Sequence, residues 1–286
     1  MRTSLPVLVL LCLGIVPPVH AQTPPSTDIY LVTLSEDGVS APAPVTNRDG
    51  YDNQPHFTAD GSSILYTSRW GDQTEIYRYN LAQKMSAKVT DTPESEYSPT
   101  PLPDGSGFSV IRVEADGTQR LWKFDNDGGN PSLVFEGIAP VGYHAWVDDH
   151  RVAMFILGNP LTLQLGDTQP GTATVQDRRI GRSIHRIPGE EGISYVSKKE
   201  EPWMIRRLDA DAQSTKAIAP TLEGSEDYAW HPDGLIYMGK GSALYRRHPS
   251  DTAWTLVAEM SEQGISGITR LAISPDGTHL VFVASH

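Results

Sequence analysis

The chain has almost no cysteine. Among its 286 residues the only one is Cys12, close to the N-terminus. The rest of the chain therefore has no disulfide and no thiol chemistry, and its core must stabilise it. A lipid anchor on Cys12 is disfavoured, because the preceding Leu11 is not a small residue. No G-x-S-x-G motif occurs either, which excludes the nucleophile elbow of the serine hydrolases.

The chain also lacks a long apolar run. Its main one covers residues 5–16 and stops at Pro17, whereas a membrane span needs about 20 apolar residues. Arg2 precedes this run, and a small-residue cleavage site follows it before Gln22. Residues 1–21 are therefore predicted to be a signal peptide. We expect a mature chain that starts near Gln22, has no membrane span and is periplasmic or secreted.

Positive charge is scarce. The chain has 23 lysines and arginines against 35 aspartates and glutamates, which gives a net charge of −12. An acidic surface repels phosphate backbones and anionic membranes. The composition therefore predicts no nucleic-acid partner, and we expect a monomer without a cofactor.

A helical period is absent as well, and short alternating runs rich in Val, Ile and Thr take its place. Asp-Gly pairs separate these runs, and they suit the positive φ of a tight hairpin turn. They occur at 60–61, 104–105, 233–234 and 276–277, with weaker marks at 149–150 and 191–192. The interval from Asp60 to Asp104 is 44 positions, and that from Asp233 to Asp276 is 43. A period of about 40 to 45 residues with four strands in each repeat indicates propeller blades.

Six turn marks predict an all-β fold, a six-bladed β-propeller that occupies residues 22–286. The last blade has only two strands before the sequence stops. Strands near 27–33 and 41–46 are therefore predicted to close it and to remove an open sheet edge. The predicted blades cover residues 51–93, 94–137, 138–178, 179–221, 222–262, and 263–286 together with 27–46.

Three of the turn marks share a longer pattern. Residues 97–105 read Y-S-P-T-P-L-P-D-G, residues 230–234 read W-H-P-D-G and residues 273–277 read I-S-P-D-G. This pattern resembles the TolB-type propeller repeat, and the resemblance covers essentially the whole mature chain. It implies that each Pro-Asp-Gly turn joins the innermost strand of a blade to the second strand. TolB carries a separate α/β domain ahead of its propeller, and with only residues 22–26 before the first strand we predict that this domain is lacking here.

The resemblance is specific for the fold and not for the function. TolB-like repeats serve binding proteins, peptidase lids and sugar lyases alike. The function must therefore be argued from the residues of the site.

The innermost strands should line a central channel, and their first residues should form a ring at one mouth. Counting six positions back from each turn mark gives Gln54, Ser98, Tyr143, His185, Asp227 and Arg270. All six are polar or hydrogen-bonding, and ligand sites favour such concave, convergent places. We predict a ligand-binding site at this mouth, formed by Gln54, His56, Tyr97, Tyr143, His144, His185, Asp227, Tyr228 and Arg270. In the alternative, an ordinary wet channel, these groups bond to each other and to water.

The three histidines of this set raise the question of a metal. His56, His144 and His185, beside Gln54, are residue types that hold divalent cations. Oligogalacturonate lyases, which use similar repeats, hold a divalent metal with histidines and a glutamine. A channel histidine bonded to the backbone is the commoner arrangement, and we predict no metal at the site.

The sequence therefore favours an exported, non-catalytic propeller that binds a protein or peptide segment, or a glycan, over its axial mouth. A metal-assisted lyase or hydrolase that acts on a carbohydrate through the channel histidines is the alternative. A structural envelope protein without a small ligand is a third possibility.

Overall fold

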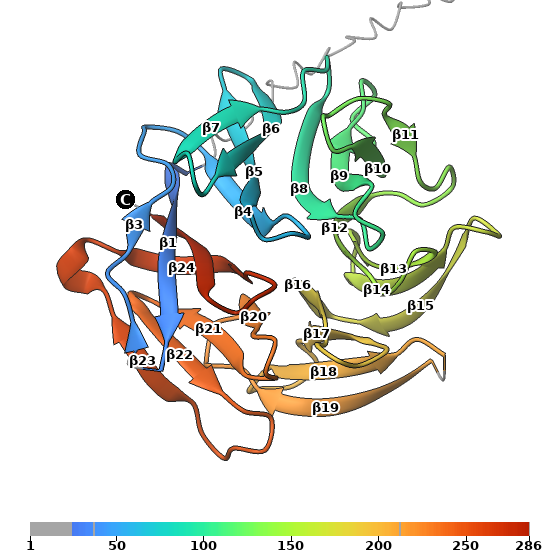
Figure 1. Cartoon of the computed structure of the whole chain (residues 1–286). Coiled ribbons are helices and arrows are strands. Elements are labelled where there is room, and N and C mark those ends of the chain that lie inside the picture. Colours follow the sequence, from blue (N-terminus) through green and yellow to red (C-terminus); the bar gives the residue numbers. More distant parts are fainter. Residues whose placement is uncertain (1–24, 37, 212, 286) are drawn as a thin grey trace, which may run out of the picture.

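The computed structural model of the chain describes residues 25–36, 38–211 and 213–285. Within these ranges the strands form six sheets arranged as blades around a central axis (Figure 1). The predicted six-bladed β-propeller is confirmed. The predicted signal peptide lies outside the described residues. In the described ranges no helix is long and apolar enough to cross a membrane.

The first five blades are each a four-stranded antiparallel sheet whose first strand lies nearest the axis. The first blade contains β4 (Asp52–Phe57), β5 (Ser63–Trp70), β6 (Gln73–Asn80) and β7 (Met85–Lys88). The second contains β8 (Ser95–Pro101), β9 (Gly107–Val113), β10 (Gln119–Asp125) and β11 (Ser132–Leu133). The third contains β12 (Val141–Trp146), β13 (Arg151–Ile156), β14 (Thr162–Asp167) and β15 (Thr172–Arg178). The fourth contains β16 (Ile180–Arg186), β17 (Ile193–Ser197), β18 (Met204–Asp209) and β19 (Ser214–Pro220). The fifth contains β20 (Tyr228–Trp230), β21 (Ile236–Lys240), β22 (Ala243–Arg247) and β23 (Thr255–Glu259), and a 3-10 turn, Ser261–Gln263, follows it.

The sixth blade is closed by the N-terminal strands, as predicted. It combines β24 (Ser266–Ile273) and β25 (His279–Ser285) with β1 (Thr27–Ser35). Strand β1 pairs antiparallel with β25 over seven residue pairs, from Thr27 opposite Ser285 to Thr33 opposite His279. The short strands β2 (Gly38–Val39) and β3 (Ala43–Pro44) both pair with β1. The two ends of the described chain therefore meet in one sheet, and β25 is not left as an open edge.

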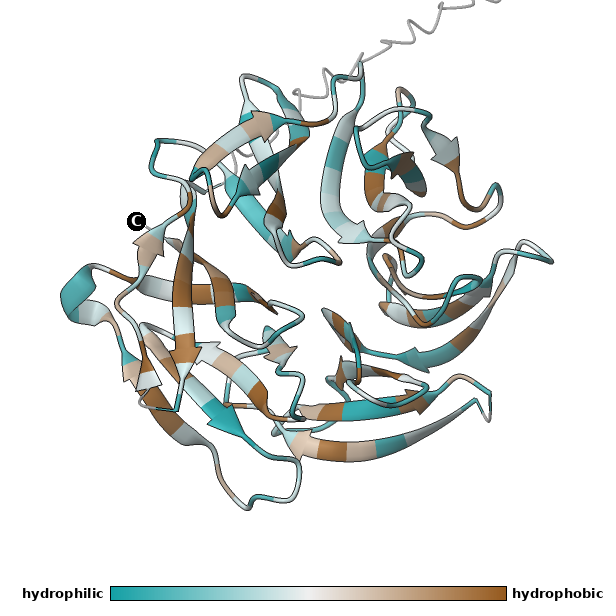
Figure 2. Cartoon of the chain, in the orientation of Figure 1, coloured by the Kyte–Doolittle hydropathy of each residue, from teal (hydrophilic) through white to brown (hydrophobic). Residues whose placement is uncertain are grey.

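The hydrophobic core is divided among the junctions between blades. Six clusters of buried side chains occur in the described residues, and each joins two neighbouring blades. The second strands are buried almost throughout, because they pack against blades on both sides. Figure 2 shows hydrophobic bands on the strands and hydrophilic residues at many of the loops. The stability of each blade therefore depends on both of its neighbours.

The Asp-Gly pairs stand between the first and second strands of their blades, but the loop is longer than a two-residue hairpin. In the first blade, the Thr58 N–H donates to the Ser63 carbonyl oxygen at 2.9 Å. Only the glycine adopts a positive φ, which is 70° at Gly61. The aspartate has another role, because Asp60 accepts the Ser62 N–H at 3.1 Å and so stabilises the turn through its side chain.

A buried acidic pair joins the first two blades. The Glu96 side chain is fully buried and accepts hydrogen bonds from Thr92 Oγ1 at 2.6 Å and Arg112 Nε at 3.0 Å. Burial raises the pKa of Glu96 from 4.5 to about 7, and the neighbouring Glu75 carboxylate adds to this shift. The folded chain therefore holds this proton more tightly than the unfolded chain does. Its stability should be highest on the acidic side and should fall as the pH rises from about 4.5 to 7.

Replacing Glu96 with Gln should flatten this pH dependence. A shift of this size corresponds to about 3 kcal/mol at its full extent. We expect Glu96→Gln to raise the free energy of unfolding at pH 8 and to leave it nearly unchanged at pH 4.5, as measured by urea unfolding across this range. Glu262→Gln, at an exposed position, is the matched control. An unchanged slope in Glu96→Gln would contradict the assignment.

Candidate functional site

Three inner strands carry the same bulge near their middle. Gln54 in β4, Ser98 in β8 and Arg270 in β24 have φ values of 55°, 55° and 52°. Positive φ is uncommon for residues other than glycine. The pairing with the second strand is interrupted at each of these positions. A bulge changes the direction of a side chain, and all three residues line one hollow on the axis.

The residues that form the ring at the mouth can be identified from the first hairpin of each blade. The residues whose N–H closes these hairpins are Thr58, Leu102, Val147, Ile187, His231 and Ser274. Four positions before them stand Gln54, Ser98, Tyr143, Ser183, Asp227 and Arg270. Five of these are the residues counted from the sequence, and in the fourth blade Ser183 takes the place of His185.

The difference in the fourth blade arises at its turn. The positive-φ residue of this turn is Gly189, with a φ of 71°, two positions before Glu191. Ile187, whose N–H closes this hairpin, lies four positions before Glu191, whereas Thr58 lies two positions before Asp60, so a count that starts from Glu191 is displaced by two residues. Accordingly, His185 pairs with Ser194 on the second strand, one step below the ring.

The ring encloses an axial hollow of about 110 Å³ that contains an ionic network. Asp227 is only 5% exposed. Its Oδ1 accepts hydrogen bonds from Arg182 Nε at 3.1 Å, Ser183 Oγ at 3.2 Å and Arg270 Nη1 at 3.3 Å. Its Oδ2 accepts a further bond from Arg182 Nη2.

Arg182 extends this network away from the axis. Its Nη1 lies 3.2 Å from Glu226 Oε1, and Lys198 Nζ lies 3.0 Å from Glu226 Oε2. The Arg182 backbone N–H also donates to Glu226 at 2.9 Å. This guanidinium is therefore held from two sides, by Asp227 in the channel and by Glu226 beside it.

Tyr143 connects the network to the opposite side of the ring. Its hydroxyl accepts a hydrogen bond from Arg270 Nη2 at 2.8 Å and is also hydrogen-bonded to the Gln54 side chain. Gln54 Oε1 in turn accepts bonds from the Ser98 N–H at 3.1 Å and Thr67 Oγ1 at 3.0 Å. Residues of four blades are thus joined across the mouth.

A second hollow, of about 260 Å³, opens beside the axial one and shares Gln54 and Tyr143 with it. Tyr51, Tyr97 and Leu157 also line it, and Leu157 is 37% exposed. We call these three residues and Tyr143 the tyrosine cup. Burial raises the pKa of Tyr51, and the nearby Tyr143 and Tyr97 add to the shift. Tyr97 therefore lies in this cup and not in the axial hollow.

The three histidines lie deeper in the channel. His56, His144 and His185 line the axial hollow and also a third hollow, of about 240 Å³, beyond it. His56 Nδ1 donates to the Phe57 carbonyl oxygen at 3.0 Å, and His144 Nε2 lies 2.6 Å from Ser109 Oγ. Burial lowers the pKa of all three, to about 3 for His144 and His185. The imidazoles are therefore neutral at pH 7.

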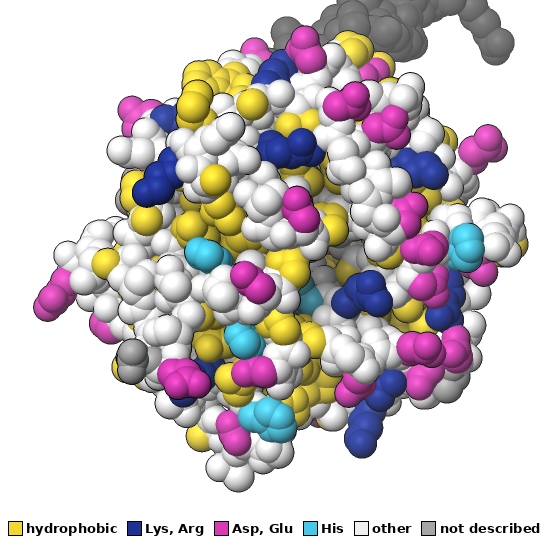
Figure 3. Space-filling view, in the orientation of Figure 1, with side chains coloured by type: hydrophobic (Ala, Val, Ile, Leu, Met, Phe, Trp, Pro, Cys, Tyr) yellow, Lys and Arg dark blue, Asp and Glu magenta, His cyan; other side chains and the backbone are white. Residues whose placement is uncertain are grey.

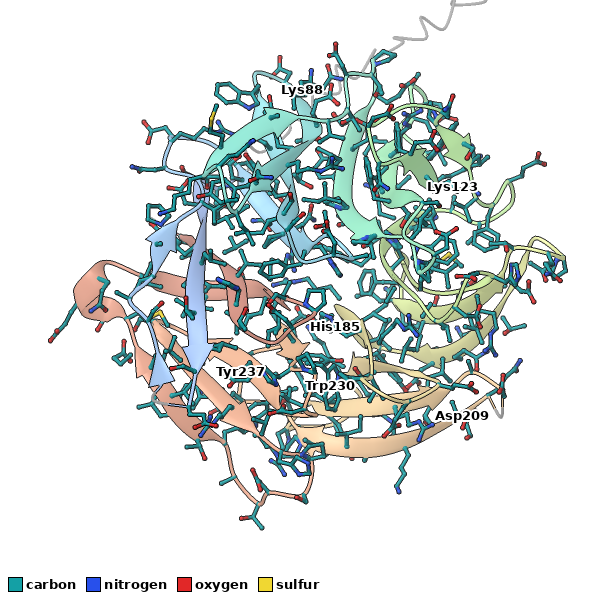
Figure 4. All side chains as sticks on the ribbon, in the orientation of Figure 1. Lys88, Lys123, His185, Asp209, Trp230 and Tyr237 are labelled. Atoms are coloured by element: carbon teal, nitrogen blue, oxygen red, sulfur yellow. The ribbon has the colours of Figure 1, made fainter. Side chains whose placement is uncertain are left out.

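These imidazoles are near each other but are not arranged as a metal centre. In the part of the chain that the structure describes, no group of three His, Cys, Asp or Glu side chains is placed to hold a metal ion. The molecule is hollowed at its axis (Figure 3), and His185 lies near the centre of the ring (Figure 4).

Tyr228 belongs to the wall of the channel. Its hydroxyl donates to Ser194 Oγ at 2.7 Å across the junction between the fourth and fifth blades, and Trp230 Nε1 donates to the same oxygen at 2.8 Å. The junction between the second and third blades repeats this arrangement, with Trp146 Nε1 2.9 Å from Ser109 Oγ. Because Tyr228 is fully buried and its hydroxyl is used in this way, it shapes the wall of the hollow.

The structure thus places eight of the nine predicted site residues around the axial hollow, and Tyr97 beside it. Sequence reasoning missed Arg182, Ser183 and Tyr51. Arg182 could have been found from the Pro188–Gly189 pair as the turn mark of the fourth blade, because it lies six positions before Pro188. Ser183 then follows as the neighbour of Arg182.

The arrangement of the six blades around an axial mouth defines this chain as a six-bladed β-propeller with a TolB-like fold. No family model matches the chain. A solved protein of Agrobacterium tumefaciens, assigned as a TolB, is similar with a TM-score of 0.74 and 16% identity, over 92% of this chain and 99% of that one. An oligogalacturonate lyase in complex with manganese is similar with a TM-score of 0.57 and 14% identity, over 85% of this chain and 79% of that one.

Sequence comparison finds an uncharacterized protein of Agrobacterium fabrum. It is 26% identical over 116 residues, which cover 38% of this chain and 39% of the relative. The match thus covers well under half of the relative's length. At these identities the comparisons establish the fold, and the ligand must be argued from the mouth itself.

Proposed function

We propose that the chain is an exported, non-catalytic binding protein that takes a protein or peptide segment over its axial mouth. The observation that carries this proposal is the joining of the axial hollow to the tyrosine cup through Gln54 and Tyr143. Tyrosine and arginine are the residue types that dominate binding hot spots, and such residues cluster in well-packed pockets. An extended segment could place one apolar side chain in the cup and the next polar group in the axial hollow.

Site-directed photo-cross-linking tests this proposal. With a photoreactive phenylalanine analogue in place of Tyr97, we expect the chain to capture a protein from the envelope extract of its host. The same analogue in place of Leu256, which is 53% exposed on the outer strand β23, is the matched control. Capture from position 97 should be lost when Tyr143 and Arg270 are both changed to Ala. Equal capture from both positions, or capture that survives these changes, would move binding away from the mouth.

One observation favours the alternative of a metal-assisted lyase or hydrolase, namely that His56, His144 and His185 line the same two hollows. The placement of the side chains weighs against it, because no group of three His, Cys, Asp or Glu side chains among the described residues is placed to hold a metal ion. Stoichiometric metal in the purified chain, lost in His144→Ala, would favour the enzyme over the binding protein.

A further inference from the structure

The ring has hydrogen-bond donors without acceptors. Ser98 Oγ and Arg270 Nε are buried and have no hydrogen-bond partner among the described residues. The Tyr143 oxygen accepts a bond from Arg270, and a second bond joins it to the Gln54 amide. Because Gln54 Oε1 already accepts two bonds, its nitrogen is the atom left to donate to Tyr143. The Tyr143 O–H proton is therefore a third donor without an acceptor.

The side-chain acceptors of the ring are already engaged. Both oxygens of Asp227 accept bonds from Arg182, and one of them also binds Ser183 and Arg270. Free lone pairs in the channel belong to His56 Nε2 and to a nitrogen of His144, and the neutral imidazole of His185 adds a further one; all three lie below the ring. A buried donor left without an acceptor is costly, so this ring favours a ligand that supplies acceptors.

The charge and the volume of the axial hollow restrict which chemical group it can bind. The charged residues that line the axial hollow are Arg182, Arg270 and Asp227, which together carry one net positive charge in a chain whose net charge is −12. A hollow of about 110 Å³ holds the end of one side chain and no more. A carboxylate offers about four lone-pair sites for the three donors, whereas an amide carbonyl offers two.

We propose that the axial hollow is a carboxylate subsite, which binds one carboxylate of an otherwise uncharged or cationic peptide. This inference rests on the proposed binding function, and it names the group that enters the mouth. The carboxylate belongs either to an Asp or Glu side chain or to the C-terminus of the peptide. The net charge of −12 disfavours a peptide with many acidic residues, because like charges repel.

Three hexapeptides with one Gly/Ser backbone, each labelled at the N-terminus with an uncharged BODIPY dye, separate these sources. The first contains an internal Glu and an amidated end, the second an internal Gln and a free C-terminus, and the third an internal Gln and an amidated end. By fluorescence polarisation with the full mature chain, at least one carboxylate peptide should bind about tenfold tighter than the third peptide. Which of the two does so identifies the source of the carboxylate. Equal affinity for all three overturns the proposal.

Variants of the ring test whether the preference arises there. Tyr143→Phe and Ser98→Ala each remove one donor and should reduce the carboxylate preference, and Arg270→Gln should abolish it. Arg246→Gln, at an exposed position of β22, removes the same charge and should leave the preference unchanged. Thermal unfolding of each variant confirms that it is folded.

A carboxylate preference that survives in Arg270→Gln, or that falls equally in Arg246→Gln, contradicts the proposal. The two proposals can be refuted independently. If position 97 cross-links a protein but the peptides show no carboxylate preference, only the carboxylate subsite is refuted. If the peptides show the preference but position 97 captures no protein, only the protein ligand is refuted.

Discussion

Removing residues 27–35 is expected to abolish cooperative unfolding of the whole propeller. Strand β1 supplies Ile29 and Val32, which are 0% and 1% exposed, to the two junctions that flank the sixth blade. It also covers β25 along seven residue pairs. Domains of this kind are stable by only about 5–15 kcal/mol. The loss of a whole buried strand should exceed that margin.

Urea unfolding followed by circular dichroism and by tryptophan fluorescence measures this effect. The full chain should show one coincident transition, and the deletion should show none. Ile29→Ala provides a graded version, with an expected loss of about 2–5 kcal/mol. Thr33→Ala, at an exposed position of the same strand, should cost little. A deletion variant with an intact cooperative transition would disprove closure by the N-terminal strand.

Asp227→Asn is expected to be the most damaging isosteric change at the mouth. It leaves the Arg182 and Arg270 guanidiniums side by side without the carboxylate that lies between them. Removing one partner of a buried ion pair costs about 3–5 kcal/mol. The variant should also lose the geometry of the axial hollow, because both arginines are positioned through Asp227.

A double-mutant cycle separates this pair energy from other effects. Arg182→Gln together with Asp227→Asn should be less destabilised than the sum of the two single variants, as measured by urea unfolding. Asp49→Asn, at an exposed position, is the control for the loss of one carboxylate. Simple additivity of Arg182→Gln and Asp227→Asn would show that the pair is not coupled.

The architecture was predictable because its determinants are local. Each Asp-Gly mark reports a turn whose glycine needs a positive φ, and the spacing of the turns sets the number of blades. The fourth blade has no Asp-Gly pair, and its turn uses Pro188 and Gly189 instead. Because this turn uses a different residue pair, the count from the sequence reached His185, two positions beyond the ring residue Ser183.

The ionic network was less accessible, because its pairs join distant parts of the sequence. Arg182 and Asp227 are 45 positions apart, and Arg270 and Tyr143 are 127 positions apart. Which of several arginines meets a given aspartate depends on the bulges and on the rotation of neighbouring blades. The sequence pattern of a single strand indicates neither the bulges nor the rotation of the blades. The donor surplus at Ser98 and Tyr143 likewise appears only when every bond across the ring has been assigned.

The closing strand also fixes the order in which this molecule can be completed during synthesis. The end of β1 at Ser35 and the start of β25 at His279 are 244 positions apart. At about 5–20 residues per second, roughly 12–50 s separate their emergence from the ribosome. Throughout that interval β1 lacks β25 and has only the short strands β2 and β3 to pair with, so its apolar face is a target for chaperones. The ring therefore cannot close until β25 has been synthesised, and until then the preceding blades form an open array.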